Sequence, residues 1–265
     1  MCIRDSTKGP GLVGSLIVGL SVAKALALAT HKALIGVHHL EGHIFSNLIE
    51  HDIEFPLLAL LVSGGHTELV VVPRLGEYEI LGKTRDDAAG EAFDKVAKLL
   101  HLLPPQGVVM GGKVVAELAE KGDPQAIRFP RALDQHSGFD FSFSGLKTAV
   151  LNHVRGLSAD ELAEQLPDIA AGFQAAVVDS LVGKTVKAME HTGIEVVALA
   201  GGVAANHSLR RCLQDAVDAR NGQLYYPSPV LCTDNAAMIA AAGLYHLSHG
   251  ERATFDLDAT PRLSL

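Results

Sequence analysis

Residues 195–206 read EVVALAGGVAAN, which is a short apolar run, two glycines and the start of a helical pattern that continues to Ala219. A strand that passes through a glycine turn into a helix is the building unit of α/β proteins, whose ligands bind beyond the carboxyl ends of the strands. We therefore predict a strand at 195–200, a turn at the two glycines and a helix after them. The stretch indicates an α/β fold with a ligand site at this turn.

A second glycine turn lies upstream. Pro56–Val62 is a continuous apolar run that suits a buried strand, and Thr67–Val72 is a second β-rich run. Between them, Ser63-Gly64-Gly65-His66 predicts a hairpin around a glycine loop. Glycine lets the backbone approach a phosphate closely and point its N–H groups at the anion, although plain tight turns explain both glycine pairs almost as well.

Most of the remaining chain shows the apolar spacing of helices. The stretch from Gly11 to Thr30 is the most apolar, but Ser15, Ser21 and Lys24 interrupt it, so we expect a buried helix rather than a membrane span. The predicted helices span 15–30, 38–50, 86–103, 113–120, 167–191 and 236–247, with a further helix from Leu146 and β-like runs at 33–37 and 139–143.

The composition excludes several classes of protein. With 48% hydrophobic residues, the 265 residues can bury one large core or two modest ones, so a globular protein is expected. Three cysteines without a C-x-x-C pair encode neither a disulfide framework nor a thiolate zinc site. The formal net charge of −8 argues against a broad basic surface for nucleic acid. No secretory signal pattern opens the chain, so we expect a cytoplasmic protein without a membrane segment.

His39 and His43 form a candidate metal site. They stand four residues apart in VHHLEGH, residues 37–43, so on a helix their imidazoles share a face and can hold one cation. Spacing alone favours surface histidines by roughly two to one, because chance pairs are common among so many histidines. As a site, the pair requires a third, harder ligand and an open position for substrate.

Asp234 is the candidate for that third ligand. It precedes the helix predicted at 236–247, so the alternative role of its carboxylate is to cap that helix. Asn206, one turn into another predicted helix, is either a ribose or adenine contact or a solvated helix residue. Asp94 either pairs with a neighbouring lysine or reaches a ligand hydroxyl. For each of these three residues, the sequence alone leaves both roles open.

Seven motifs occur in the order of one known family. They are GPGLVG (9–14), HHLEGH (38–43), LVSGGHT (61–67), the helix start at Asp86–Lys95, DFSFSGLKT (140–148), AGGVAAN (200–206) and CTDN (232–235). Together they resemble the TsaD family, the tRNA N6-adenosine threonylcarbamoyltransferases, formerly described as O-sialoglycoprotein endopeptidases. The resemblance covers the chain from Gly9 to about Arg262.

The resemblance implies the fold and the site residues. The implied fold is the actin-like ATPase superfold (ASKHA, RNase H-like), an α/β architecture of two lobes, with the first lobe incomplete. Residues 1–54, completed by 235–265, form the rest of the first lobe, and 55–234 form the second. The implied metal ligands are His39, His43 and Asp234, and the implied substrate-binding residues are Leu61, Val62, Ser63, Gly64, Gly65, Asp94, Gly112 and Asn206. The implied cofactor is one divalent metal ion per subunit, Fe2+ in preference to Zn2+. His and Asp ligands suit either metal.

The implied reaction is an acyl transfer. The N6 amine of adenosine 37, in tRNAs that read codons beginning with A, attacks the carbamoyl carbon of threonylcarbamoyl-AMP and releases AMP. This mixed anhydride is already activated, so the protein mainly positions two reactants and stabilises charge on oxygen. The implied partners are tRNA, a paralogous TsaB-like subunit and a TsaE-like ATPase. No side chain stands out as a general base, so no catalytic residue is assigned.

Two departures from the family pattern stand out. The family's first strand and first phosphate loop are not present before Gly9, and Met1–Lys8 does not match a strand, so we expect an N-terminally truncated chain. Residues 104–112 are longer than the family's glycine turn and lack its flanking prolines, so the assignment of Gly112 rests on an altered motif.

Two alternative functions remain open on the sequence alone. One is a metallopeptidase, which is disfavoured because Glu41 is not placed as in the H-E-x-x-H motif. The other is an inactive fragment or binding subunit of the same complex.

Overall fold

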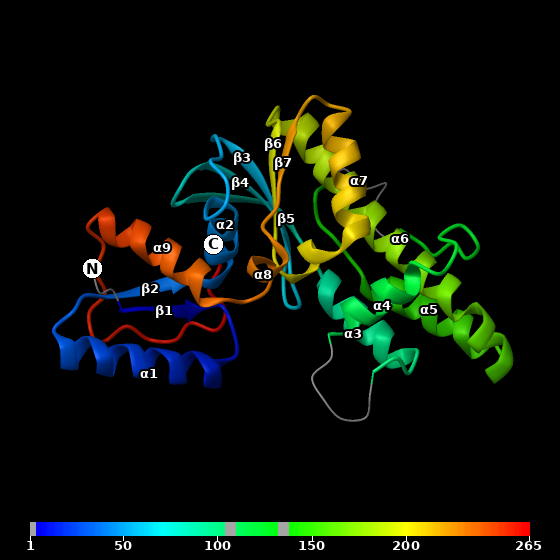
Figure 1. Cartoon of the computed structure of the whole chain (residues 1–265), viewed down its shortest axis with the longest axis horizontal. Helices are drawn as coiled ribbons and strands as arrows, with labels where there is room; N and C mark the ends of the chain where they lie inside the picture. The colour runs from blue at the N-terminus through cyan, green and yellow to red at the C-terminus, as the bar shows by residue number, and fades with distance from the viewer. Residues whose placement is uncertain (1–3, 104–109, 132–137) are drawn as a thin grey trace. The chain divides into compact units, whose positions relative to one another are not determined.

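The computed structural model describes residues 4–103, 110–131 and 138–265, and the chain divides into two compact units. Unit 1 contains the chain up to Ile53 together with Tyr226–Leu265, and unit 2 contains Glu54–Tyr225. Figure 1 shows the elements of both units, coloured along the chain. The C-terminal segment joins unit 1 at Tyr226, upstream of the boundary expected after residue 234.

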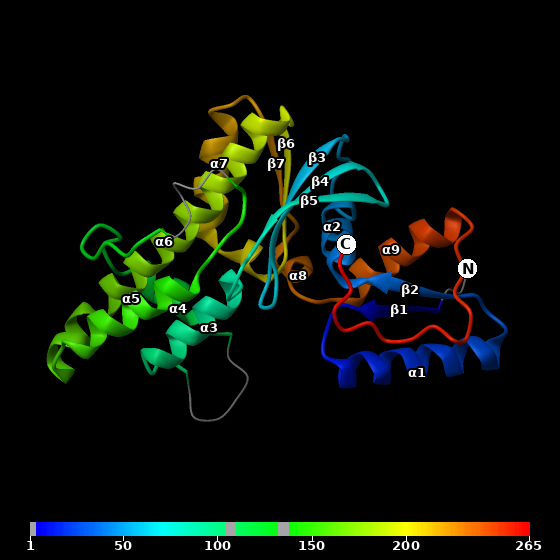
Figure 2. The same ribbon diagram turned by 180° about the vertical axis from the view of Figure 1, so that it is seen from behind.

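The described part of unit 1 consists of β1 (Arg4–Gly9), α1 (Val13–Thr30), β2 (Leu34–His38), α2 (His39–Leu48), α8 (Pro229–Cys232) and α9 (Ala236–Ser248). The strands β1 and β2 pair in parallel. Figure 1 and Figure 2 show α1 on one face of this pair and α9 on the other. The helix α2 follows β2 directly and packs against α9.

The start of the chain forms a strand where none was expected. β1 pairs with β2 so that Thr7 lies opposite Val37, and the expectation that Met1–Lys8 does not match a strand is therefore wrong for its described residues. Parallel pairing needs an extended backbone whose N–H and C=O groups meet those of a neighbour, and a polar sequence can provide this.

The helix α1 forms where it was predicted, but it is not the buried helix that was expected. One face packs within unit 1 through Leu16, Leu20, Ala23 and Ala27. Apolar residues occur all around the helix, and a two-stranded sheet covers only one side of it. The exposed side chains of α1 include Val13, Ile17, Val18, Val22, Leu26 and Leu28.

Unit 2 contains a five-stranded sheet in the order β5-β4-β3-β6-β7, with helices on one side of it (Figures 1 and 2). Its strands are β3 (Leu57–Val62), β4 (Thr67–Arg74), β5 (Glu77–Lys83), β6 (Val196–Ala200) and β7 (Gln223–Tyr225). Its described helices are α3 (Ala89–Leu99), α4 (Gly111–Ala119), α5 (Ser144–Arg155), α6 (Ala159–Thr192), the short 3-10 helix η1 (Gly202–Ala205) and α7 (His207–Asp218). The predicted hairpin β3–β4 is confirmed, and β6 lies parallel to β3.

The helix α6 is the core helix of unit 2. It begins at a capping box, in which Ser158 and Glu161 bind each other's backbone N–H groups, and it ends at Gly193, where φ is 70°. By length and composition, α1 and α6 are the two described helices that are long and apolar enough to cross a membrane. In α6, however, 72% of the apolar window is buried inside the protein, as expected for a core helix.

Residues 139–143 do not form the predicted strand. Among them, Phe141 makes an isolated β-bridge with Thr84. Phe141 and Phe143 are both buried, with their rings stacked at a centroid distance of 6.2 Å. Buried phenylalanines therefore alternate with polar residues as predicted, but the segment does not form a ladder of backbone hydrogen bonds with a neighbouring strand. The N–H group of Phe143 donates to the carboxylate of Asp86 instead of to a neighbouring strand.

Candidate metal centre and glycine loops

His39 and His43 lie at the beginning of α2, which is capped by His38. Nδ1 of His38 accepts a hydrogen bond from the N–H group of Leu40 at 3.2 Å. Burial lowers the pKa of His38 to about 4, so its imidazole is neutral and can accept this bond. One helical turn separates His39 from His43, and their rings meet edge to face with centroids 4.9 Å apart. The two imidazoles therefore share one face of α2.

Asp234 completes a cluster with the two histidines. Its Oδ1 lies 3.4 Å from Nε2 of His39 and 3.3 Å from Nε2 of His43, and one ligand atom from each of the three residues lies within 4.8 Å of the others. The two imidazoles hold the pKa of Asp234 far below its ordinary value, so the carboxylate is charged. The side chain of His43 is 1% exposed and that of Asp234 is 77% exposed, so the cluster is buried at one end and open to solvent at the other.

The cap of α9 is Asn235 and not Asp234. Oδ1 of Asn235 accepts a hydrogen bond from the N–H group of Met238 at 2.9 Å. Its Nδ2 donates to the carbonyl groups of Leu231 and Thr233, which fixes the turn between α8 and α9. The capping role that the sequence left open for Asp234 is therefore filled by its neighbour, and the carboxylate of Asp234 faces the histidines instead.

The helices α2 and α9 are held together beside the cluster. A Cβ atom on Gly42 would lie 2.9 Å from the side chain of Ile239, so glycine allows the close approach of the two helices. Nε2 of His246 lies 2.9 Å from both carboxylate oxygens of buried Glu41, and its Nδ1 lies 2.7 Å from Glu251. Because Glu41 is paired with His246, it is not placed as the base that the metallopeptidase alternative requires.

Raising the pH is expected to weaken the link between α2 and α9. Glu41, and after it Glu251, raise the pKa of His246 to about 9 from an ordinary value of 6.5. Such a group stabilises the folded protein fully below its unfolded pKa, and this stabilisation is lost as the pH rises through the folded pKa. Between about pH 7 and pH 10 we expect the free energy of unfolding to fall by about 1–2 kcal/mol, measured by denaturant titration. His246→Gln should be less stable at neutral pH and should lose this pH dependence; if the variant keeps it, another group is responsible.

The donor set of the cluster fits a divalent cation. Nε2 of buried His43 has the carboxylate of Asp234 3.3 Å away, whereas its Nδ1 makes no hydrogen bond within the described part of the chain. Two imidazoles and one carboxylate are the ligands of iron and zinc sites that keep further positions for substrate. The exposed side of Asp234 provides access to such positions.

The two glycine loops lie next to each other in unit 2, because β3 and β6 are parallel neighbours. Gly201 has a φ of +96°, and a Cβ atom there would lie 2.4 Å from the carbonyl oxygen of Val62 at the end of β3. Gly90 in the first turn of α3 is equally constrained, since its Cβ atom would lie 2.5 Å from the carbonyl oxygen of Ser63. The loops and the start of α3 thus converge at the carboxyl ends of parallel strands, where α/β proteins bind ligands.

Only part of the predicted loop contact is accessible. The side chains of Leu61 and Val62 are buried in β3, so only their backbone atoms are placed to contact a ligand. Gly64 and Gly65 are exposed, and a Cβ atom on either would meet no atom within 4 Å. Oγ of Ser63 accepts the N–H group of His66 at 3.1 Å, which shapes the loop.

Asp94 contacts Gly111 rather than Gly112. Its Oδ1 accepts the N–H group of Gly111 at 2.9 Å, in the first turn of α4. A Cβ atom on Gly111 would lie 2.7 Å from this oxygen, whereas one on Gly112 would make an ordinary contact with Phe93 at 3.7 Å. The position that requires glycine is therefore 111. Residues 104–109, which form most of the departure from the family's glycine turn, lie outside the described residues.

Asn206 is the N-cap of α7. Its Oδ1 accepts the N–H group of Leu209 at 2.9 Å, and its Nδ2 donates to Gln174 at 2.7 Å. This cap divides the helix that was predicted after the second glycine loop into η1 and α7, so the prediction of one continuous helix is wrong. Both ends of the Asn206 amide are bonded within unit 2.

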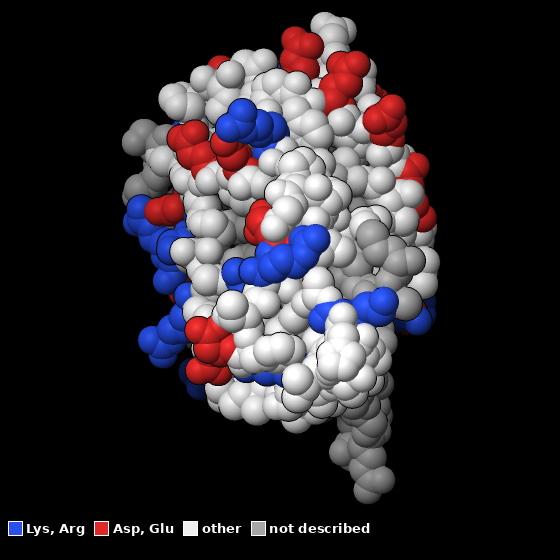
Figure 3. Space-filling model, turned by 90° about the vertical axis from the view of Figure 1, so that its left-hand side faces the viewer, with Lys and Arg blue, Asp and Glu red and all other residues white. Residues whose placement is uncertain are grey.

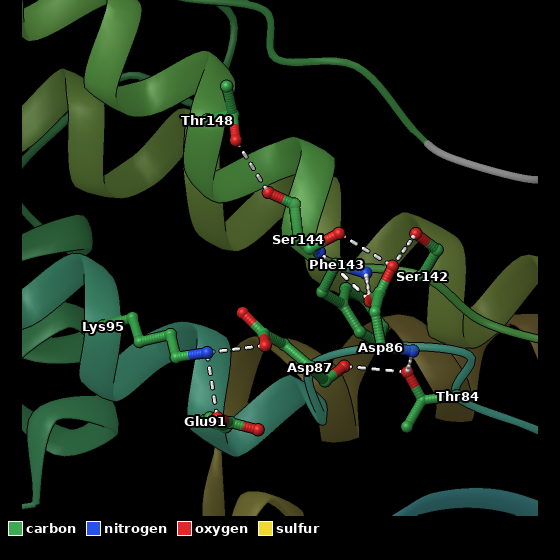
Figure 4. Close-up of polar contacts among 9 residues, drawn as sticks. All are labelled: Thr84, Asp86, Asp87, Glu91, Lys95, Ser142, Phe143, Ser144 and Thr148. Atoms are coloured by element: carbon green, nitrogen blue, oxygen red, sulfur yellow. Dashed lines mark hydrogen bonds and ion pairs between the residues drawn. The ribbon is translucent and has the colours of Figure 1, made fainter.

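Asp86 was predicted only as the first residue of the helix at 86–103, and its bonding role was not foreseen. The predicted helix begins only at Ala89, and Asp86 precedes it. Figure 4 shows its carboxylate accepting bonds from the hydroxyl groups of Ser142 and Ser144 and from the N–H groups of Phe143 and Ser144. Burial alone would raise the pKa of Asp86, but these hydrogen bonds lower it. Asp86 thereby ties the start of α5 to the segment before α3.

Comparison with known sequences gives one family. The family model described as "TsaD: tRNA N6-adenosine threonylcarbamoyltransferase" matches residues 6–241. A protein named tRNA N6-adenosine threonylcarbamoyltransferase from Symbiobacterium thermophilum is 55% identical over 262 residues, which are 98% of this chain and 74% of that protein. A protein of the same name from Geotalea uraniireducens is 52% identical over 255 residues, which are 96% and 73% of the two chains.

Solved structures that resemble this chain share little of its sequence, so they show its fold alone. HypF from T. kodakarensis has a TM-score of 0.69 at 17% identity, over 93% of this chain and 40% of its own. The activator of 2-hydroxyisocaproyl-CoA dehydratase from Clostridium difficile, with bound ADPNP, has a TM-score of 0.53 at 15% identity, over 91% and 83% of the two chains. These neighbours have the actin-like ATPase fold, which confirms the predicted fold class.

Proposed function

Because this chain belongs to the tRNA N6-adenosine threonylcarbamoyltransferase family, we propose that His39, His43 and Asp234 bind the metal ion of this acyltransferase. The enzyme transfers the threonylcarbamoyl group from threonylcarbamoyl-AMP to N6 of adenosine 37 in tRNA. The observation that carries the metal assignment is the cluster of three ligand atoms within 4.8 Å of one another.

The residues of unit 1 would hold one divalent cation, Fe2+ in preference to Zn2+. Bound there, the cation would supply Lewis-acid polarisation to an oxygen of the threonylcarbamoyl group. His39 and His43 provide nitrogen ligands from one helix face, and Asp234 provides a carboxylate from the turn before α9. The contact between Glu41 and His246 links α2 to α9. It would help to hold the two histidines of α2 next to Asp234, which lies just before α9.

The glycine loops of unit 2 are proposed to bind the phosphate of threonylcarbamoyl-AMP. The exposed backbone of Gly64 and Gly65 can approach an anion closely because neither residue has a side chain. Asp94, Asn206 and the segment at Gly111-Gly112 complete the proposed substrate contacts. No described carboxylate or imidazole is assigned as a general base, and the AMP leaving group is stable as an anion without protonation.

The tRNA substrate follows from the family, and we further propose the protein partners and the cellular compartment of this chain. We expect the chain to work in the cytoplasm with a paralogous TsaB-like subunit and a TsaE-like ATPase. The exposed apolar side chains of α1 support a protein partner for unit 1, because contiguous apolar surface of this kind often marks an interface.

The test is transfer of the threonylcarbamoyl group to unmodified tRNA. The chain is incubated with threonylcarbamoyl-AMP and tRNA, and the modified adenosine is measured by mass spectrometry after nuclease digestion. Transfer that stops on chelation and returns with Fe2+ supports the proposal. Transfer that persists after complete metal removal contradicts the metal assignment, and cleavage of a protein substrate without any transfer would favour the metallopeptidase alternative.

A further inference from the structure

Unit 2 contains an arginine-lined pocket that the proposed catalytic roles do not use. It has a volume of about 350 Å³, many times the roughly 30 Å³ that one water molecule occupies. The segment after α4 contributes Arg128 and Arg131, α6 contributes Asp179, and the first turns of α7 contribute Ser208 and Arg211. The pocket is thus built by three chain segments that all belong to unit 2.

The charges of the pocket favour an anion. Arg131 is held in place, because Nε and Nη2 donate to Asp179 at 3.0 and 2.6 Å and Nη1 donates to the carbonyl oxygen of Phe129 at 2.6 Å. These bonds leave part of its donor capacity available to a ligand. Arg128 and Arg211 are exposed, and Arg128 donates to neutral Gln125 at 3.3 Å. One aspartate therefore faces three arginines, so the pocket is positive.

The start of α7 adds to this preference. The Asn206 cap satisfies the N–H group of Leu209, while the N–H groups of His207 and Ser208 before it have no acceptor within the helix. Ser208, in this first turn, lines the pocket. A helix N-terminus next to guanidinium groups is suited to phosphate oxygens. None of the described residues that line the pocket is aromatic, so it offers no stacking surface for a base.

We propose that this arginine pocket binds a phosphodiester group of the tRNA backbone. The inference rests on the proposed function, because that function supplies tRNA as the ligand. The exposed Arg128 and Arg211 are accessible to a phosphate on a large, folded RNA. A local positive pocket is compatible with a formal net charge of −8, because it needs no broad basic surface. On the face shown in Figure 3, Lys and Arg are interspersed with Asp and Glu and separated by wide uncharged areas, so that face offers no broad basic surface.

The test compares tRNA binding by the full chain and by Arg128→Gln/Arg211→Gln, measured by fluorescence anisotropy over a range of salt concentrations. Arg131 is left unchanged, because its removal would leave Asp179 without its partner. We expect the double variant to bind tRNA about 10-fold more weakly at low salt, and the slope of log affinity against log salt to fall by about 1–2. Lys98→Gln/Arg155→Gln removes the same charge from two exposed positions outside the pocket and should have a smaller effect.

Each outcome separates this inference from the proposed function. If wild-type chain transfers the threonylcarbamoyl group while the double variant binds tRNA like wild type, the pocket proposal is overturned and the function stands. If the double variant no longer binds inorganic phosphate, as measured by phosphorus NMR, but still binds tRNA like wild type, the pocket binds a small anion and not RNA, and the pocket proposal is overturned. If the variant loses tRNA binding although wild type shows no transfer, the pocket proposal holds and the proposed function fails. Wild-type chain that does not bind tRNA overturns the pocket proposal.

Discussion

Replacing His39 by alanine is expected to lower the affinity for a divalent cation by at least about 100-fold and to abolish measurable threonylcarbamoyl transfer. The substitution leaves one imidazole and one carboxylate, which are too few protein ligands to hold the ion against solvent. Affinity is measured by competition with a chromophoric chelator, and transfer by the modified adenosine content of tRNA. The side chain of His39 is 20% exposed, so its truncation also removes some packing, and a urea titration of the variant checks that it remains folded.

The matched control for this substitution is His207→Ala. His207 is exposed at the first position of α7 in unit 2, outside the metal cluster. The control should bind metal and transfer the group like wild type. Wild-type metal affinity in His39→Ala would remove this residue from the site, and an equal loss in both variants would show that the effect is not specific to the cluster.

Replacing Gly201 by alanine is expected to destabilise the folded protein by about 3 kcal/mol or more. The new Cβ atom would lie 2.4 Å from the carbonyl oxygen of Val62, and the φ of +96° is one that residues with a side chain rarely adopt. The backbone of β3 cannot move away easily, because it is hydrogen-bonded to β4 and β6 on its two sides. The measurement is the free energy of unfolding from a urea titration.

Gly202→Ala provides the neighbouring control. A Cβ atom on Gly202 meets nothing within 4 Å, and its φ lies outside the left-handed region. Its cost should stay below about 1 kcal/mol. Similar stabilities of the two variants would mean that the two glycine loops do not meet at the end of β3 as described.

The elements that were predicted correctly have strong local signals. The strands β3 and β6 are continuous apolar runs followed by glycine loops, and most of the long helix α6 has the spacing that predicted a helix at 167–191. Seven ordered motifs identified the family, and the family supplied the fold. The spacing of His39 and His43 likewise placed both imidazoles on one helix face, where the structure has them.

The predictions that failed concern interactions between distant parts of the chain. The edge strands β5 and β7 were not predicted. They are strands because each pairs with a neighbouring strand, and their apolar content alone does not indicate this. The segment at 139–143 has a strand pattern, but the N–H group of Phe143 donates to the carboxylate of Asp86, 57 positions away in the sequence. In the same way, only the structure shows that Asn235 caps α9 and that Asp234 therefore faces the histidines.

X-ray absorption spectroscopy of the Fe2+-loaded chain tests the central claim most directly, because it counts the imidazole ligands of the bound ion. We predict one ion per chain, with scattering from two imidazoles in wild type. The variant His43→Ala, loaded at a high Fe2+ concentration so that it retains metal, should show scattering from one imidazole. A wild-type spectrum without imidazole scattering, or one that is the same in His43→Ala, would contradict the assignment of His39, His43 and Asp234 as the metal site.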